Sequence, residues 1–527
     1  MERVESEMNI LDHIVEICSK ELKEEDSNTR QILLTLFSSC TDNPQNLRIL
    51  APSGEGKTYL VTKLASLFPQ ENIIILGKAS PQSLKYNLNS KRVVENGSGN
   101  WQDYDVAIKP LEEELEKTKD KEKIQKIKNQ MRELQDSSCD FIDFSNKTII
   151  FVDSQSFEMF ESLKPTMSHD QENIKSFSVN KSKSGTMRGQ KFLFHGFPAI
   201  IYCSAKDEIV KDETNEINTR FNTISLNASR IKYRKMLEFE ALCSSLPHSI
   251  RQEEIISDDE IGELKQEILQ IIKQIPDNGE VVNPYTDGLS KLFSDDAGSR
   301  TRQFKILNNN TRMHTLVNAK FRPKIIYNGI TIPIVTRLDV EESCKLTKET
   351  KEIQPYKIKY FNDHIRKAIS DIGKEKQTVG GSIKCLTASE IADCITRKGI
   401  TTDRQRLQET YLKHLVSHGF LEEFVDPDNK SRYVFAVSTP YLEKEAKIES
   451  TLIDTSLLDA SCVDSFVSKF IEQRFNSGKL EIFDENNNEL TLKQLLENLP
   501  QIVVQTPEIR HELSSIEAST SIEGKEN

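Results

Sequence analysis

The chain of 527 residues has no run of about 18 apolar residues, the length that crosses a membrane as a helix, so we expect no transmembrane segment. Its nine cysteines include no CxxC pair and no histidine partners at zinc spacing. This pattern favours buried thiols in a reducing cytosol over a disulfide framework or a zinc site. Residues 1–26 are acidic and amphipathic, unlike a secretory signal. We therefore predict a cytoplasmic protein without membrane contacts, of roughly three domains.

Net positive charge is also absent. The formal charge is −12, which argues against a surface that binds nucleic acid over its whole extent. One segment departs from this balance, because no Asp or Glu occurs between Glu172 and Asp207. It carries Lys181, Lys183 and Arg188, so any contact with nucleic acid would be a local basic patch.

A phosphate-binding motif occurs near the N-terminus. The sequence APSGEGKT follows an apolar strand expected over 47–50 and precedes an amphipathic helix expected over 59–68. It matches GxxxxGK[ST] except at Ala51, a position that mostly needs a small residue. Backbone N–H groups of such a loop hold phosphates, Lys57 neutralises them, and the Thr58 hydroxyl holds Mg²⁺. We expect ATP and Mg²⁺ as cofactors, bound by Ala51, Pro52, Ser53, Gly54, Glu55, Gly56, Lys57 and Thr58.

A second anchor is the apolar run 148–152, which ends in Asp153. A carboxylate at the carboxyl end of such a strand is a usual Mg²⁺ ligand. The glutamate that often follows, and that activates water, is missing, because Ser154 and Gln155 occupy the next positions. A glutamine can orient water in some nucleotide-hydrolysing enzymes, so Gln155 is a candidate. Either Gln155, Glu158 or a residue from elsewhere polarises the water, or hydrolysis is slow.

Five apolar runs recur along the first half of the chain, separated by helical or polar material. Strands that alternate with helices imply an α/β fold with a parallel sheet and helices on both faces. Five strands complete a nucleotide-binding core of the P-loop NTPase type. We expect these strands at 47–50, 73–76, 148–152, 198–203 and 222–226.

In the order of these motifs, residues 47–324 resemble the AAA+ ATPases. The resemblance implies ATP hydrolysis by a homo-oligomer, for which a hexameric ring is one arrangement. In that family the fourth strand ends in a polar sensor, here Cys203 or Ser204. The fifth is preceded by an arginine finger that reaches the γ-phosphate of a neighbouring subunit, and Arg220 in INTRFNTISL matches it. A surface arginine at a helix end is the alternative for Arg220.

Residues 296–324 look like the helical lid of the same family. The resemblance places the second sensor arginine there, as Arg300 or Arg302. With the lid, the candidate catalytic residues are Lys57, Asp153, Gln155, Glu158, Ser204, Arg220, Arg300 and Arg302.

A long insertion separates the second and third strands. Within it, Ile124, Ile127, Met131 and Leu134 follow a 3–4–3 spacing, and acids alternate with lysines in blocks. This pattern predicts a projecting helical arm or a short coiled-coil hairpin that could contact protein partners. One solvated surface helix is the alternative.

The basic segment lies between the third and fourth strands and has the pattern of a β-hairpin over about 176–196, with a Ser/Gly-rich turn. In replicative AAA+ helicases such as the minichromosome-maintenance proteins, and in superfamily 3 helicases, a hairpin before the first sensor contacts the DNA backbone. Such a grip needs charge without base recognition, which Lys181, Lys183 and Arg188 supply. A surface hairpin made soluble by its lysines is the alternative.

The region 386–438 has the outline of a winged helix, with a helix at 389–397, a second helix after Asp403, and a β-hairpin. On the second helix, Arg404, Arg406 and Lys413 would face the DNA major groove. Nearby glutamates dilute this charge, and winged helices also bind proteins, so both uses stay open.

These features predict an ATP-dependent DNA helicase or translocase that acts in DNA replication or related DNA metabolism. The alternative is a DNA-bound AAA+ nucleotide switch of the origin-initiator or transcription-regulator type, with slow hydrolysis. A non-DNA ATPase that binds proteins is a third possibility. The expected segments are N-terminal helices (1–46), ATPase core (47–228), lid (229–325), connector (326–380), winged helix (381–440), C-terminal helices (441–505) and a disordered tail (506–527).

Overall fold

The computed structural model divides into two compact units, Leu22–Leu269 and Met1–Glu21 with Gln270–Asn527. Each unit is described separately. The structure describes residues 9–80, 91–96, 100–169, 172–181, 187–205, 217, 220–247, 250–251, 255–276, 279–291, 293, 298–346, 355–378, 381–417, 419–429, 431–442 and 460–498. Among these residues, no helix is both long and apolar enough to span a bilayer.

A five-stranded sheet with the order β10-β1-β9-β6-β2 forms the centre of the first unit. All four strand pairings are parallel, and three of the strands are completely buried, as expected when both faces of a sheet are covered. The predicted α/β fold of the P-loop NTPase type is confirmed, and each strand end lies within one residue of its predicted position. The strands are β1 (Asn46–Leu50), β2 (Ile73–Leu76), β6 (Thr148–Phe151), β9 (Ala199–Ser204) and β10 (Asn222–Ser225).

Helices pack on this sheet through apolar faces. Helix α7 inserts Phe160 edge-on against Phe151, Tyr202 and Phe221, which come from three separate parts of the chain. Aromatic side chains in this edge-to-face arrangement fix the register of a helix on a sheet. The helices of this region are α2 (Asp26–Ser38), α3 (Lys57–Ala65), the 3-10 turn η1 (Gln70–Asn72), α7 (Phe157–Met167) and α8 (Arg230–Ser245).

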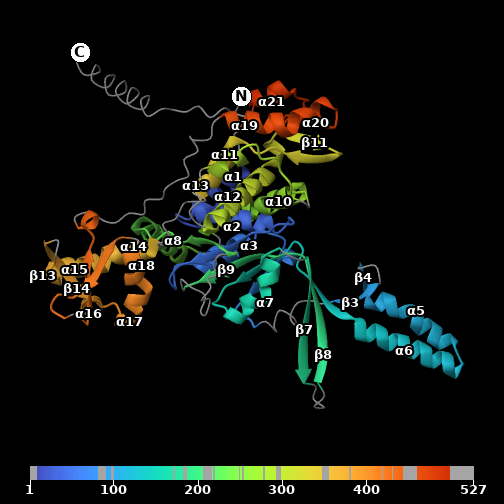
Figure 1. The fold of residues 1–527 in the computed structure, drawn as a ribbon, viewed down its shortest axis with the longest axis horizontal. Coiled ribbons are helices and arrows are strands. Elements are labelled where there is room, and N and C mark those ends of the chain that lie inside the picture. Colours follow the sequence, from blue (N-terminus) through green and yellow to red (C-terminus); the bar gives the residue numbers. More distant parts are fainter. Residues whose placement is uncertain are drawn as a thin grey trace. The chain divides into compact units, whose positions relative to one another are not determined.

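A second sheet, with the order β4-β3-β5-β8-β7, is built from the insertions, and of its strands only the β7–β8 hairpin was predicted. Two helices, α5 (Tyr104–Lys117) and α6 (Lys121–Ser137), follow β4 in the sequence and precede β5. They lie side by side (Figure 1). Ile127 of α6 is buried. Of the two alternatives for this insertion, the structure has the helical hairpin, and a lone surface helix is wrong. The strands are β3 (Lys91–Asn96), β4 (Asn100–Asp103), β5 (Cys139–Asp143), β7 (Asn173–Lys181) and β8 (Met187–His195).

The second unit contains a three-stranded sheet that joins distant parts of the sequence. Strand β17 (Leu480–Phe483) pairs with β11 (Lys324–Tyr327), which also pairs with β12 (Ile330–Pro333). One apolar cluster unites residues of the expected lid, connector and C-terminal segments. Residues of these three expected segments therefore share one core, which was not predicted because a strand pairing over this separation leaves no local sequence signal.

Helices surround this small sheet. Helix α10 (Asp258–Gln274) includes the boundary between the two units. The others are α1 (Ile10–Ser19), α11 (Thr286–Lys291), α12 (Gly298–Val317), the 3-10 turn η3 (Ala319–Phe321), α13 (Arg337–Leu346), α19 (Ala460–Phe466), the π-helical turn η8 (Val467–Ile471), α20 (Glu472–Asn476) and α21 (Leu492–Asn498).

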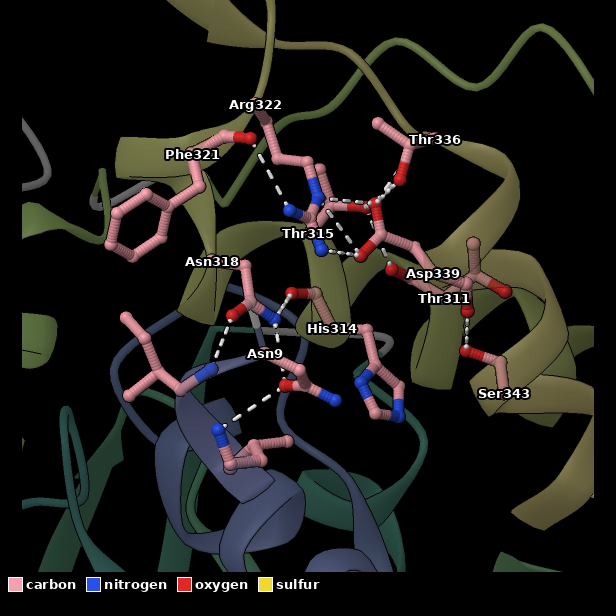
Figure 2. Close-up of polar contacts among 12 residues, drawn as sticks. Asn9, Thr311, His314, Thr315, Asn318, Phe321, Arg322, Thr336, Asp339 and Ser343 are labelled. Carbon is pink, nitrogen blue, oxygen red and sulfur yellow. Dashed lines mark hydrogen bonds and ion pairs between the residues drawn. The ribbon is translucent and has the colours of Figure 1, made fainter. Parts of the chain in front are cut away.

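A buried ion pair connects Arg322, the residue after η3, with α13 (Figure 2). The side chains of Arg322 and Asp339 are each only 1% exposed, and Arg322 Nη2 lies 2.8 Å from Asp339 Oδ1. The hydroxyls of Thr315 and Thr336 also donate to Asp339 Oδ2, at 3.0 and 2.9 Å. A buried carboxylate is tolerated only when its lone pairs are filled in this way. The network therefore fixes α13 against α12.

A second polar contact holds the N-terminus of α1 in the same unit (Figure 2). Asn318 Oδ1 accepts from the backbone N–H of Ile10 at 2.9 Å, and its Nδ2 donates to Asn9 Oδ1 at 3.2 Å. Asn9 also caps α1. One side chain thus supplies an acceptor to a helix terminus whose N–H groups lack partners within the helix.

The predicted winged helix is present, with a four-stranded sheet of order β13-β14-β16-β15. Leu407, Leu412 and Leu415, which follow Asp403, are fully buried. An additional helical stretch and the hairpin β13–β14 were not predicted. The elements are α14 (Pro355–Tyr360), η4 (Phe361–Ile365), α15 (Arg366–Ile372), β13 (Lys374–Thr378), β14 (Gly381–Thr387), α16 (Ala388–Arg397), α17 (Arg404–Leu407), η5 (Gln408–Leu412), α18 (Lys413–Ser417), β15 (Leu421–Val425), β16 (Tyr433–Val437) and η6 (Thr439–Tyr441).

Candidate nucleotide-binding site

The loop between β1 and α3 has the backbone of an anion-binding turn. Gly54 and Gly56 have φ of 89° and 87°, in the left-handed region that favours glycine. Gly56 is the N-cap of α3, and no side chain caps this helix. The N–H groups of the first turn of a helix have no acceptors within the helix. An uncapped N-terminus at the end of a buried strand is therefore a good site for phosphate.

Lys57 is held at this loop. Its Nζ donates to the carbonyl oxygens of Ala51 and Pro52, at 2.6 and 2.7 Å. Burial lowers the pKa of Lys57, while the nearby groups of Cys203 and Glu55 oppose that change. The two carbonyl oxygens occupy positions around the ammonium that phosphate oxygens can take instead. The lysine is thus placed in advance for a phosphate ligand.

Ala51 fits the position where the motif has glycine. It is 2% exposed, and its N–H donates to the carbonyl oxygen of Ser204 at 3.2 Å. Its φ is not positive, so the backbone at Ala51 accepts a Cβ without strain. The hydrogen bond also places the end of β9 directly beside the start of the loop.

The carboxyl ends of the parallel strands bring the other predicted residues to this edge of the sheet. β9 lies between β1 and β6, so Ser204 and Cys203 lie between the phosphate loop and Asp153. Cys203 is buried, which raises its pKa to about 12, and both Lys57 and Asp153 are near enough to affect it electrostatically. The predicted sensor strand, loop lysine and acidic residue therefore converge.

The residues at this edge fit a nucleotide with Mg²⁺. Thr58, in the first turn of α3, and Asp153, just beyond β6, are both exposed. Magnesium is usually bound by one or two protein oxygens together with phosphate oxygens and water. A hydroxyl and a carboxylate on this edge match that ligand set, and the uncapped α3 N-terminus matches the phosphates.

Gln155 connects two strands. Its Oε1 accepts from the backbone N–H of Ala79 at 2.9 Å, and its Nε2 donates to the carbonyls of Gly77 and Asp153 at 2.8 and 2.7 Å. Both ends of the amide are thus engaged with the backbone that follows β2 and β6. Glu158 is exposed in the first turn of α7. That either Gln155 or Glu158 activates water stays a prediction, beside a residue from elsewhere and slow hydrolysis.

Arg220 lies near the amino ends of the strands, opposite the ends at which the phosphate loop lies. In the parallel register, Asn222 of β10 pairs with Leu47 at the amino end of β1, whereas the phosphate loop follows the carboxyl end. The Nη1 of Arg220 donates to the hydroxyl of Ser168, the C-cap of α7. The phosphate loop and Arg220 of one chain are therefore separated by the length of the strands.

The second-sensor candidates and the basic hairpin are described only in part. Arg300 and Arg302 belong to the first turns of α12, with side chains outside the described part. Strands β7 and β8 pair from Asn173 and His195 up to Lys181 and Met187, which confirms the predicted hairpin.

Two of its three basic residues are near the end of this ladder. Lys181 is the last residue of β7, and Arg188 pairs with Asn180, while Lys183 lies outside the described residues. In the winged helix, Arg404 and Lys413 are exposed, and the side chain of Arg406 is outside the described part.

Sequence reasoning missed one neighbour of the loop. The hydroxyl of Tyr233, on α8, donates to the carboxylate of Glu55 inside the phosphate loop. The two residues are 178 positions apart, and no spacing or motif links them. Only the position of α8 directly after the fifth strand hinted that its first turn would lie at this edge.

Comparison with known proteins does not assign the chain to a protein family. No protein-family model matches the chain, and no curated protein matches it. A solved structure, that of the Aeropyrum pernix Orc1 protein in complex with DNA, matches with 10% identity, covering 85% of this chain and 92% of that one, at a TM-score of 0.20. That score carries no argument about function. The strand order and the loop geometry place the chain among proteins with the P-loop NTPase fold.

Proposed function

We propose that the protein is an ATPase of the AAA+ type that binds ATP with Mg²⁺ at residues 51–58 and acts on DNA. The observation that supports this most is the convergence of the uncapped α3 N-terminus, the Lys57 ammonium and the Asp153 carboxylate at one edge of a parallel sheet. Nucleotides bind at this edge in open α/β sheets.

In this proposal the residues at the carboxyl ends of the strands have separate roles. Lys57 exchanges its two carbonyl partners for phosphate oxygens, and the N–H groups of the α3 first turn hold the same phosphates. Thr58 and Asp153 hold Mg²⁺, which supplies positive charge to the transferring phosphoryl group. Ser204, between the two, contacts the γ-phosphate.

The proposal includes a homo-oligomer, with a hexameric ring as one form. Arg220 is at the edge of the sheet opposite the phosphate loop, so it would complete the active site of a neighbouring subunit and not its own. An arginine supplied in this way stabilises the charge of the transition state. The alternative is that Arg220 only anchors α7 through Ser168. The subunit-mixing experiment described below distinguishes this role from a role in the neighbouring active site.

Helicase or translocase activity is the first form of the proposal. It is supported by the long β7–β8 hairpin, nine residues in each strand, whose described end carries Lys181 and Arg188. A hairpin of this kind can hold the phosphate backbone of DNA without reading its sequence. Arg404 and Lys413 of the winged helix offer a second DNA contact, and the α5–α6 hairpin offers a surface to protein partners.

A DNA-bound nucleotide switch is the second form. It is supported by Gln155, whose amide is engaged by backbone groups on both sides, and by the absence of a glutamate at that position. Without an activated water, ATP would be held and hydrolysed slowly. Steady-state ATP hydrolysis with and without single-stranded DNA separates the forms. Strong stimulation with strand unwinding supports the helicase, whereas slow, unstimulated turnover with ATP-dependent duplex binding supports the switch.

A further inference from the structure

The phosphate loop contains a negative charge of its own, on Glu55. This residue lies between Gly54 and Gly56, the two positions whose backbone makes the loop suitable for phosphate. A carboxylate so close to phosphate repels it, because like charges a few ångströms apart in a partly buried site are poorly screened. Glu55 is also near enough to Lys57 to stabilise its protonated form. An unrestrained Glu55 would therefore compete with phosphate for the same ammonium.

Tyr233 holds this carboxylate. Its hydroxyl is 3.0 Å from Glu55 Oε1 and 2.9 Å from Glu55 Oε2, so one donor lies between both oxygens. Both side chains are half-buried. Burial is the main cause that raises the pKa of Tyr233, and the Glu55 carboxylate raises it further. The hydroxyl therefore stays protonated and can donate a hydrogen bond.

Tyr233 is itself on a fixed support. The preceding residue, Lys232, forms an ion pair with Glu25 at 2.6 Å, and the two side chains are 3% and 5% exposed. Lys235, on the next turn of α8, pairs with Glu24. Breaking a buried ion pair such as Lys232–Glu25 is strongly unfavourable, so the first turns of α8 have little freedom to move. The hydroxyl is thus presented to Glu55 from a rigid position.

We propose that Tyr233 is a positioning residue for nucleotide binding, which holds the Glu55 carboxylate away from Lys57 and from the phosphate site. This inference rests on the proposed function, because it concerns the same loop. It adds a role for a residue that lies outside every sequence motif of the chain. It also ties phosphate affinity to the position of α8.

The test is a double-mutant cycle on ATP·Mg²⁺ binding, measured by calorimetry with the full chain. Tyr233→Phe removes one hydroxyl and should weaken binding about tenfold, which corresponds to about 1.4 kcal/mol. Glu55→Gln should bind as well as the wild type or better. The Tyr233→Phe, Glu55→Gln double variant should recover the affinity of Glu55→Gln alone, because no carboxylate remains to be held. The loss in Tyr233→Phe should also shrink at high salt, since it is electrostatic.

Matched variants separate the possible outcomes. Tyr433→Phe removes the hydroxyl of an exposed tyrosine in the winged helix and should change nothing. If Tyr233→Phe binds like the wild type, or if the double variant binds as weakly as Tyr233→Phe, the inference is overturned while the proposed function survives. Absence of ATP binding by the wild-type chain would overturn the proposed function, and this inference with it.

Discussion

The ammonium of Lys57 lies 2.6 Å from the carbonyl oxygen of Ala51, so the lysine of the phosphate loop is bonded to the residue that begins the loop. We predict that Lys57→Ala abolishes the thermal stabilisation produced by ATP, because the loop amides cannot replace its charge. A ligand at one hundred times its Kd stabilises the folded state by about 2.7 kcal/mol, which a thermal shift detects. Lys117→Ala, on the exposed face of α5, is the control. Wild-type stabilisation of the Lys57 variant would exclude this loop as the nucleotide site.

Arg220 is expected to act in a neighbouring subunit. Arg220→Ala should keep ATP affinity and lose hydrolysis, since it is remote from the loop of its own chain. Mixing it with Lys57→Ala should restore some activity, because mixed interfaces combine an intact loop with an intact arginine. The exposed Arg132→Ala on α6 is the control. Unchanged hydrolysis by Arg220→Ala in a strictly monomeric preparation would show that Arg220 does not act between subunits.

The parts of the fold that the sequence predicted share a physical signal. Three of the five central strands are completely buried, and such strands read as short apolar runs, such as TIIF in β6. In the second sheet only the β7–β8 hairpin was predicted, and the other strands were missed because they are short and partly polar, as in NWQD of β4. Strand β17 pairs with β11 across more than one hundred and fifty residues, and its four residues carry no sign of that partner.

The candidate site also contains residues that the sequence predicted and contacts that it did not predict. Lys57, Asp153 and Ser204 were found because each follows a strand end that a motif or a resemblance marks. Tyr233 was not found, since its contact with Glu55 depends on where α8 begins in space. The amide of Gln155 was predicted as a water-orienting group, and its contacts to the backbone after β2 were not foreseen because they are 76 and 78 residues away.

Gln155 provides a test between structural and catalytic roles. Its three side-chain hydrogen bonds join the ends of β2 and β6, and each contributes about 0.5–1.5 kcal/mol. We predict that Gln155→Ala lowers the unfolding temperature and weakens ATP binding, measured by thermal denaturation and calorimetry. Gln125→Ala, at an exposed position of α6, is the control. If Gln155→Ala instead lowers kcat with stability and binding unchanged, Gln155 orients the water.

Removing one partner of the Arg322–Asp339 pair should lower the free energy of unfolding strongly, whereas replacing both partners with apolar residues should lower it little. Asp339→Asn leaves a buried guanidinium without its counter-charge, and we expect a loss of about 3–5 kcal/mol in the free energy of unfolding. The double variant Arg322→Met, Asp339→Leu should recover most of it, because no charge remains buried. Denaturant titration gives both values. The exposed pair Lys398–Asp371 is the control, for which Asp371→Asn should cost about 1 kcal/mol or less.

The basic hairpin gives the last prediction. The sequence predicts Lys181, Lys183 and Arg188 on a solvated hairpin, where substitutions rarely change stability by more than about 0.5 kcal/mol. Replacing all three with Ala should therefore spare the fold. ATP hydrolysis without DNA should also survive, since the hairpin and the phosphate loop belong to different sheets. If these residues hold phosphates, DNA affinity should fall for every sequence alike, with loss of DNA-stimulated hydrolysis.

Salt dependence decides whether the loss comes from phosphate contacts. Each contact to duplex DNA contributes about one unit to the slope of log K against log[salt], so the triple variant should flatten the slope by roughly two to three units. Lys121, Lys123 and Lys128 are exposed on α6 and, replaced together with Ala, remove the same charge from the helical hairpin. That control should leave the slope unchanged. If both triple variants behave alike, the effect is one of net charge. If the hairpin variant keeps both affinity and slope, the winged helix is left as the DNA contact, and the nucleotide switch becomes the better account of the protein.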